Sequence, residues 1–240
     1  MERLPPMRLQ SHQHIEATHL ITRLDLRREY RPHGLTINVP RGTLDANRRW
    51  HLARSKYENY ESEAGLATFR ERLPLLQAGG GIGVVAAYLN RCLLPREHRV
   101  FEGCAEIVPT LIGNMVRNDC ERFLVKHALL CNCGDHPEGG GLPWSPAWNA
   151  NYASVVKRLT FKEATRGIEA PFNLLLDIEG CENAWLSDQD LDDVESIVID
   201  ADPVEPESPV DTARLLARLE NLGFRHRYFR GNVHGLTRSA

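Results

Sequence analysis

Apolar residues follow two patterns along the chain. Short, nearly continuous apolar stretches are typical of strands buried on both faces, and they occur at 74–78, 98–103, 122–130, 172–180 and 194–202. A spacing of about 3.6 positions between apolar residues indicates a helix over 55–72. Further helices are expected over 84–94, 105–118, 160–168, 182–191 and 209–223. This alternation predicts an α/β fold with a doubly wound, mostly parallel sheet and helices on both faces.

The two ends of the chain follow other patterns. Two short segments near the C-terminal end, 224–231 and 233–239, are separated by a turn and predict a hairpin with an antiparallel strand at the sheet edge. The N-terminal part is polar and irregular, with an alternation typical of short strands at 18–24 and 34–40. We therefore expect a small N-terminal extension over 1–49 and one main domain over 50–240.

A glycine-rich turn links the first apolar strand to the helix after it. Gly79, Gly81 and Gly83 alternate with other residues in a G-x-G-x-G pattern. Such a turn lets a ligand approach the backbone closely, and the helix N-terminus favours negative or nucleotide-bearing groups. The dinucleotide fingerprint requires glycine where Val84 stands, and the phosphate-binding P-loop ending in Gly-Lys-Ser/Thr is also missing. The pattern therefore disfavours NAD, FAD and ATP bound through these two motifs.

Glu102 ends the second strand, 19 residues beyond Gly83. In doubly wound folds, a carboxylate at this place accepts hydrogen bonds from the ribose hydroxyls of a bound nucleoside. A lone glutamate at a strand end is more often only solvated. The combination of Glu102 with the glycine turn therefore favours a ribose ligand.

Five stretches resemble the FkbM family of S-adenosylmethionine-dependent methyltransferases, in the family's order. They are KYENYESE (56–63), QAGGGIGVVAAYL (77–89), RVFEGCAEIVPTLIGNMVRND (99–119), FNLLLDIEGCENAWL (172–186) and LLARLENLGFRHRYFRG (215–231). The resemblance implies the Rossmann-like class I methyltransferase fold with a seven-stranded sheet, and S-adenosyl-L-methionine as the cofactor. The DIEGCE sequence after a long apolar strand is the most family-specific of these features.

The resemblance also implies roles for individual residues. Gly79, Gly81 and Gly83 would hold the methionine part of the cofactor, and Glu102 its ribose. Tyr57, Glu58 and Glu61 match a YE..E element that lies near the cofactor or the acceptor. Gln77 stands where the family has an acid that organises the methionine ammonium group, and its neutral amide can still accept hydrogen bonds.

Three acids, Asp177, Glu179 and Glu182, lie at the carboxyl end of the apolar strand 172–180, where such sheets place their ligands. Methyl transfer to a hydroxyl benefits from a base or a metal, so Asp177 or Glu179 is expected to orient or deprotonate the acceptor. A divalent cation of the Mg type would suit these oxygen ligands. The alternative is that one of the acids caps the next helix. His127 and His136 are alternative bases, although a histidine on a strand is more often packed.

A loop rich in glycine and proline, 134–152, contains two tryptophans and is the expected cover on the acceptor side. Trp144 and Trp148 could stack on a sugar or another flat substrate, or they could pin the loop to the domain. The Cys131-Asn132-Cys133 sequence has no second ligand pair at zinc-finger spacing, so reduced structural cysteines are expected.

Composition narrows the function further. The net charge of −3 and the pI near 6.4 argue against a general nucleic-acid or membrane-surface binder. No apolar run of membrane-spanning length and no signal-peptide pattern occurs, so a cytoplasmic location is expected. We therefore expect O-methylation of a hydroxyl on a sugar, glycan or secondary metabolite. N-methylation of a small amine and a non-catalytic cofactor-binding role in a biosynthetic complex remain open, as do the acceptor and the oligomeric state.

Overall fold

The computed structural model describes residues 28–130, 156–178, 182–186, 191–201 and 209–239. The chain divides into two compact units, Met1–Tyr57 and Glu58–Ala240, and each is described by itself. None of the helices in these ranges is long and apolar enough to cross a membrane.

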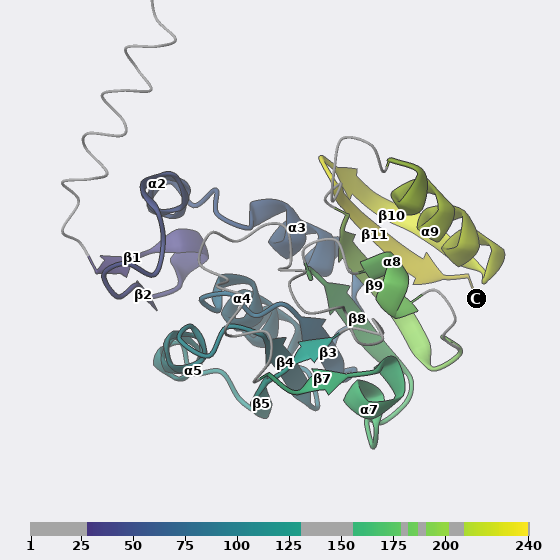
Figure 1. Ribbon diagram of the computed structural model, residues 1–240, viewed down its shortest axis with the longest axis horizontal. Coiled ribbons are helices and arrows are strands. Elements are labelled where there is room, and N and C mark those ends of the chain that lie inside the picture. Colours follow the sequence, from purple (N-terminus) through teal and green to yellow (C-terminus); the bar gives the residue numbers. More distant parts are fainter. Residues whose placement is uncertain (1–27, 131–155, 179–181, 187–190, 202–208, 240) are drawn as a thin grey trace, which may run out of the picture. The chain divides into compact units, whose positions relative to one another are not determined.

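In its described residues, from 28 on, the smaller unit contains a two-stranded antiparallel ribbon and the α-helix α2 (Figure 1). Its elements are β1 Glu29–Tyr30, the 3₁₀ turn η1 Pro32–Gly34, β2 Ile37–Asn38 and α2 Ala46–Ala53. The Asp45 carboxylate caps α2 by accepting a hydrogen bond from the Arg48 backbone N–H at 2.8 Å. The strand predicted at 34–40 is therefore present as β2, whereas the one at 18–24 lies outside the described residues.

The larger unit is built on a seven-stranded sheet with the strand order β10, β11, β9, β8, β3, β4, β5 (Figure 1). The strands are β3 Leu75–Ala78, β4 His98–Glu102, β5 Phe123–His127, β8 Phe172–Leu176, β9 Val194–Asp200, β10 Phe224–Arg230 and β11 Val233–Arg238. Neighbouring strands from β5 to β9 pair in parallel, and β11 is antiparallel to both β9 and β10. This confirms the predicted doubly wound, mostly parallel seven-stranded sheet.

One detail of the hairpin differs from the prediction. The antiparallel strand β11 lies inside the sheet, between β9 and β10, and the edge strand is β10. The reason is the connection through α9, which returns the chain so that β10 runs in the same direction as β9. The gap between them is then filled by the next strand, which must run the opposite way because the connecting turn is too short for a crossover.

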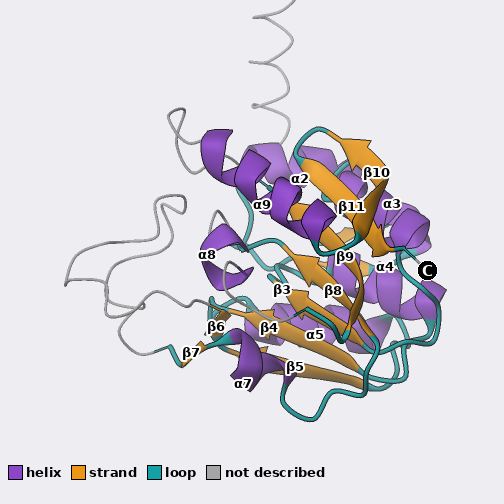
Figure 2. Cartoon of the chain, turned by 90° about the vertical axis from the view of Figure 1, so that its right-hand side faces the viewer, coloured by secondary structure: helices purple, strands orange, loops and turns teal. Residues whose placement is uncertain are grey.

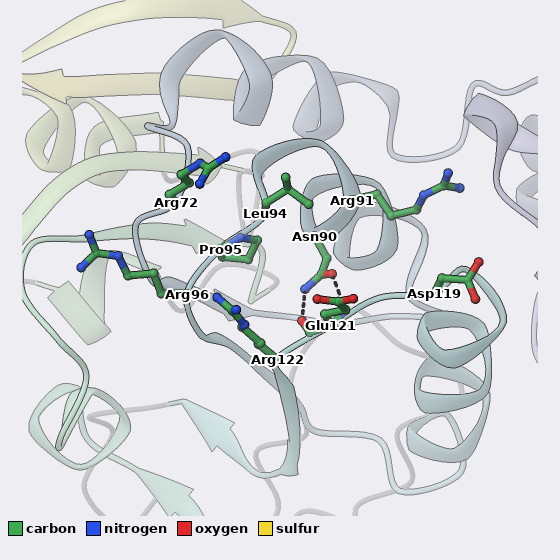
Figure 3. Close-up of a pocket in the computed structure, with 9 residues that line it drawn as sticks. All are labelled: Arg72, Asn90, Arg91, Leu94, Pro95, Arg96, Asp119, Glu121 and Arg122. Carbon is green, nitrogen blue, oxygen red and sulfur yellow. Dashed lines mark hydrogen bonds between the residues drawn. The ribbon is translucent and has the colours of Figure 1, made fainter.

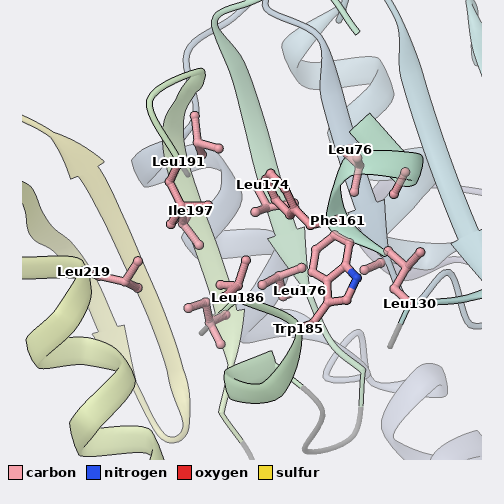
Figure 4. Packing of buried hydrophobic residues seen from close by; sticks show 14 of the residues in the cluster. Leu76, Leu130, Phe161, Leu174, Leu176, Trp185, Leu186, Leu191, Ile197 and Leu219 are labelled. Carbon is pink, nitrogen blue, oxygen red and sulfur yellow. The ribbon is translucent and has the colours of Figure 1, made fainter. Parts of the chain in front are cut away.

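Helices cover both faces of the sheet (Figure 2). They are α3 Asn59–Thr68, α4 Val84–Leu93, α5 Val108–Arg117, α7 Phe161–Thr165, α8 Glu182–Leu186 and α9 Pro209–Asn221. Apolar side chains of α3, α4 and α5 pack on one face. Those of α7, α8 and α9 pack on the other, where Trp185 is fully buried and meets Phe161 edge to face (Figure 4).

The bounds of several elements differ from those predicted. Helix α3 begins four residues later than expected because Glu58 has a left-handed φ of 48°, which interrupts a helix. Pro109 lies in the first turn of α5, where the missing N–H of proline costs no helical hydrogen bond. The expected strand over 122–130 divides into β5 and β6 Leu129–Leu130. The second of these pairs with β7 Arg158–Leu159 in a separate parallel ribbon.

Candidate functional site

The glycine turn lies at the carboxyl end of β3, between this strand and α4. Gly79, Gly81 and Gly83 have φ angles of 88°, 48° and 89°, in the left-handed region that favours glycine. A Cβ atom on Gly79 would lie 1.9 Å from the backbone oxygen of Asp177, so this position accepts no side chain without a shift of backbone. The turn is therefore tightly packed against the chain that leaves β8.

Glu102 holds the glycine turn to the end of β4. Its Oε2 accepts hydrogen bonds from the backbone N–H groups of Gly80 at 3.2 Å and Gly81 at 2.8 Å, and its Oε1 accepts one from Cys104 at 2.7 Å. Burial raises the pKa of the Glu102 carboxyl, although its backbone hydrogen bonds pull that pKa down. The expected ribose ligand is thus a buried carboxylate that also organises the backbone of the turn.

Gln77 carries an unsatisfied acceptor on the face of the sheet covered by α3 and α4. The residue is only 2% exposed, and its Nε2 donates to the Gly79 carbonyl oxygen at 2.9 Å. Its Oε1 is buried and accepts no hydrogen bond from any described residue. A buried amide oxygen without a donor is costly, so this atom is suited to a donor brought by a ligand.

Three carboxylates converge where β8 and β9 end. Oxygens of Glu61 on α3, Asp177 after β8 and Asp200 at the end of β9 lie within 4.8 Å of one another. Like charges this close favour a cation between them, either a ligand ammonium group or a metal with oxygen ligands. Among the described residues these three are the ones that could hold a divalent cation. The sequence prediction included Glu61 and Asp177 but missed Asp200.

Other predicted site residues have structural contacts. The backbone oxygen of Glu58 accepts a hydrogen bond from the Ser62 hydroxyl at 3.0 Å, in the first turn of α3. Glu182 is buried, and its Oε1 accepts a hydrogen bond from the Ile178 backbone N–H at 2.8 Å, which holds the turn after β8. The exposed His127 ring lies 3.0 Å from the carbonyl oxygen of Gly103.

The remaining predicted residues lie outside the described residues. They are Glu179, His136, Trp144, Trp148, Cys131 and Cys133. The described cysteines Cys92, Cys104 and Cys120 are free thiols. Burial raises the pKa of Cys120 to about 12, so this thiol is protonated at neutral pH and unsuited to nucleophilic chemistry.

No protein-family model matches the chain, and no curated protein matches it in sequence. Among solved structures, it is similar to precorrin-6y C5,15-methyltransferase from Geobacter metallireducens GS-15, with 11% identity over 77% of this chain and 90% of that chain and a TM-score of 0.49. A methyltransferase from Pyrococcus furiosus has 14% identity over 93% and 94% of the two chains and a TM-score of 0.47.

A third similar structure is M. capricolum TrmK in complex with S-adenosyl-homocysteine, with 6% identity, coverage of 75% of this chain and 67% of that chain, and a TM-score of 0.46. Likenesses at this level say nothing about the substrate. The narrower FkbM resemblance stays a prediction from the sequence. The order and directions of the seven strands, with the antiparallel β11 between β10 and β9, are those of the class I methyltransferase fold.

Proposed function

We propose that this protein is an S-adenosylmethionine-dependent methyltransferase. The observation that carries the proposal is the convergence, at one edge of a class I methyltransferase sheet, of the glycine turn, the buried Glu102 and the carboxylates of Glu61, Asp177 and Asp200. The crevice outside the carboxyl ends of parallel strands is where open α/β sheets bind their ligands.

The residues present fit the charge pattern of this cofactor. S-adenosylmethionine carries a sulfonium and an ammonium group, and a carboxylate cluster provides the negative potential that both require. Gln77 Oε1 is a buried acceptor that the ammonium group could satisfy. Gly79, Gly81 and Gly83 would hold the methionine part against bare backbone, Glu102 would bind the ribose hydroxyls, and Glu58 would lie near the cofactor. The bound cofactor supplies an electrophilic methyl group on its sulfonium.

The remaining requirement is activation of the acceptor hydroxyl. A neutral hydroxyl is a poor nucleophile, and in this proposal Asp177, directly after β8, orients the hydroxyl and accepts its proton. Glu179 and the acceptor-side residues Trp144 and Trp148 remain part of the proposal. We therefore propose O-methylation of a sugar, glycan or secondary metabolite, in which the Asp177 carboxylate takes the hydroxyl proton as the oxygen attacks the methyl group.

The primary test is calorimetric titration of the protein with S-adenosyl-homocysteine, followed by assays of methyl transfer to hydroxyl and amine acceptors. We expect saturable binding with 1:1 stoichiometry. The absence of binding at millimolar ligand would contradict the proposal. Binding without transfer to any acceptor would instead support a non-catalytic cofactor-binding protein.

The substitution Glu102→Gln is expected to weaken S-adenosyl-homocysteine binding by roughly 10- to 100-fold, since hydrogen bonds to a charged group contribute about 1.5–3 kcal/mol.

The pKa of Glu102 is raised above 4.5, so wild-type affinity should fall on acidification through that raised value, as the carboxylate is protonated. The unfolding free energy should change in the opposite direction over the same pH window, falling as the pH rises, because the folded state binds the proton more tightly.

Titrations of the wild type and of Glu102→Gln with S-adenosyl-homocysteine across this pH range test whether Glu102 binds the ribose. In Glu102→Gln, the acid-dependent loss of affinity should disappear. The variant Glu106→Gln, which changes an exposed carboxylate in the same loop, is the matched control and should bind like the wild type. Equal affinity of Glu102→Gln and the wild type at neutral pH would exclude Glu102 as the ribose ligand.

The substitution Asp177→Asn is expected to lower kcat for a hydroxyl acceptor by about 100-fold, because an amide cannot act as a base. The affinity for S-adenosyl-homocysteine should fall less than kcat, because Glu61 and Asp200 keep negative charge in the carboxylate cluster. The measurement is a pH–rate profile, in which the acidic limb should vanish. An unchanged profile with an amine acceptor would favour N-methylation, because a neutral amine needs no base to attack.

A further inference from the structure

A hollow lies at the opposite edge of the sheet from the glycine turn, where β3, β4 and β5 begin. Its volume is about 510 Å³, within the range of small-molecule sites. Loops before the three strands line it, together with the end of α4. The lining residues are Arg72, Asn90, Arg91, Leu94, Pro95, Arg96, Asp119, Glu121 and Arg122 (Figure 3).

Buried hydrogen bonds hold these loops in place. Asn90, only 3% exposed, pairs with the Glu121 backbone in both directions: its Nδ2 donates to the carbonyl oxygen at 2.9 Å, and its Oδ1 accepts from the N–H at 3.0 Å. The Arg72 backbone N–H donates to the Leu93 carbonyl oxygen at 2.9 Å. The Arg122 carbonyl oxygen accepts from the His98 backbone N–H at 2.9 Å. The backbone that carries the arginines is therefore preorganised, which lowers the entropic cost of binding.

The lining carries an excess of positive charge. Four arginines face two acids, Asp119 and Glu121. Arg96 is paired with Glu169 at 2.8 Å, but in the part of the chain that the structure describes Arg72, Arg91 and Arg122 form no ion pair. In Figure 3, Arg72 and Arg122 lie on the same side of the hollow as Arg96, and Arg91 points away from them. Arg72 and Arg122 are therefore the cations available to a ligand on that side.

The backbone of the lining is unusual. Seven described residues other than glycine have a positive φ, and four of them line this hollow: Arg72, Leu94, Asp119 and Arg122, with φ angles of 62°, 49°, 53° and 52°. Each such conformation is energetically unfavourable for a residue with a side chain. Strained backbone of this kind gathers at binding sites, where a required side chain outweighs the strain.

We propose that this hollow binds the phosphate group of a small phosphorylated metabolite. Guanidinium groups recognise phosphate through paired, charge-assisted hydrogen bonds, and Arg72 and Arg122 are not neutralised by other described residues. Leu94, 59% exposed, and Pro95 provide an apolar floor for the rest of the ligand. A concave site of this volume, on a chain with a net charge of −3, fits a small molecule rather than a nucleic-acid backbone.

The test uses the full chain and isothermal titration with inorganic pyrophosphate and with glucose 6-phosphate, and glucose serves as the uncharged control. We expect both phosphates to bind with Kd values below about 1 mM, corresponding to roughly −4 kcal/mol, and glucose not to bind. The variant R72Q/R122Q should weaken both phosphates at least tenfold. Glutamine keeps a side chain at both left-handed positions, so the unfolded chain gains no flexibility, as it would with glycine.

The variant R214Q/R227Q is the matched control, since it removes the same charge from two exposed arginines far from the hollow in sequence. It should bind both phosphates like the wild type, and R72Q/R122Q should retain wild-type affinity for S-adenosyl-homocysteine. If R72Q/R122Q unfolds, R122Q alone should still weaken pyrophosphate at least threefold. Failure of the wild type to bind either phosphate, or equal weakening by the two double variants, would overturn the proposal.

Discussion

Replacing Gly79 with alanine is expected to lower the free energy of unfolding by about 2–5 kcal/mol and to abolish measurable binding of S-adenosyl-homocysteine. Two costs add. The left-handed φ of 88° disfavours any side chain by roughly 1–2 kcal/mol. The new Cβ would also lie 1.9 Å from the Asp177 backbone oxygen, and overpacking of a tight contact costs a further ~1–3 kcal/mol. Relief of this overlap must move the turn or the chain after β8, and both border the proposed cofactor site.

The control is Gly167→Ala, which isolates the first of these costs. Gly167 has a φ of 72° but nothing within 4 Å of an added Cβ. Chemical denaturation should therefore show a loss of only about 1–2 kcal/mol for this variant, and its ligand affinity should stay that of the wild type. Equal losses of stability in the two variants would show that the contact with Asp177 does not constrain the turn.

Replacing Trp185 with alanine is expected to lower the free energy of unfolding by about 3–5 kcal/mol, as for other large buried side chains. Trp185 is fully buried between α7 and the sheet, and its ring centroid lies 5.1 Å from that of Phe161 (Figure 4). Its Nε1 also donates to the Leu159 carbonyl oxygen at 3.2 Å, so the substitution leaves that oxygen without this donor. Urea denaturation followed by circular dichroism measures the loss.

Two further variants test whether lost packing causes the loss of stability in Trp185→Ala. Trp185→Phe keeps an aromatic ring and should cost clearly less than alanine. Phe229→Ala removes an aromatic side chain that is 67% exposed, and such surface changes cost about 0.5 kcal/mol or less. A loss below about 1 kcal/mol for Trp185→Ala would show that the core closes around the missing ring.

The sequence predicted the central strands β3, β4, β8 and β9 well because these strands are buried on both faces. The stretches around Leu75, Val100, Leu174 and Ile197 are nearly continuous apolar runs, and no other element type explains runs of this length between helices. The direction of β11 was predicted, but not its place inside the sheet. That place depends on a long-range pairing with β9, and the sequence of the hairpin does not indicate which strand it pairs with.

The candidate site was only partly predictable. A glycine turn and a strand-terminal glutamate are local signals, so Gly79, Gly81 and Glu102 could be selected from spacing alone. The packing of Glu102 against the amides of that turn depends on the lateral position of β4 and was not predicted. Asp200 was missed because a lone acid after an apolar strand is common. Only the pairing of β9 beside β8 brings it to Asp177.

The left-handed backbone around the hollow also leads to an expectation about the residues that related sequences have at these positions. Glycine at positions 72, 94, 119 or 122 would remove the backbone strain and cost few contacts. In species whose protein does not need these side chains, substitutions to glycine or asparagine should therefore accumulate. Retention of arginine at 72 and 122 across distant species would then record selection on the side chain itself. The residues at positions 72 and 122 in related sequences would thus distinguish a hollow that binds a ligand from one that has no such role.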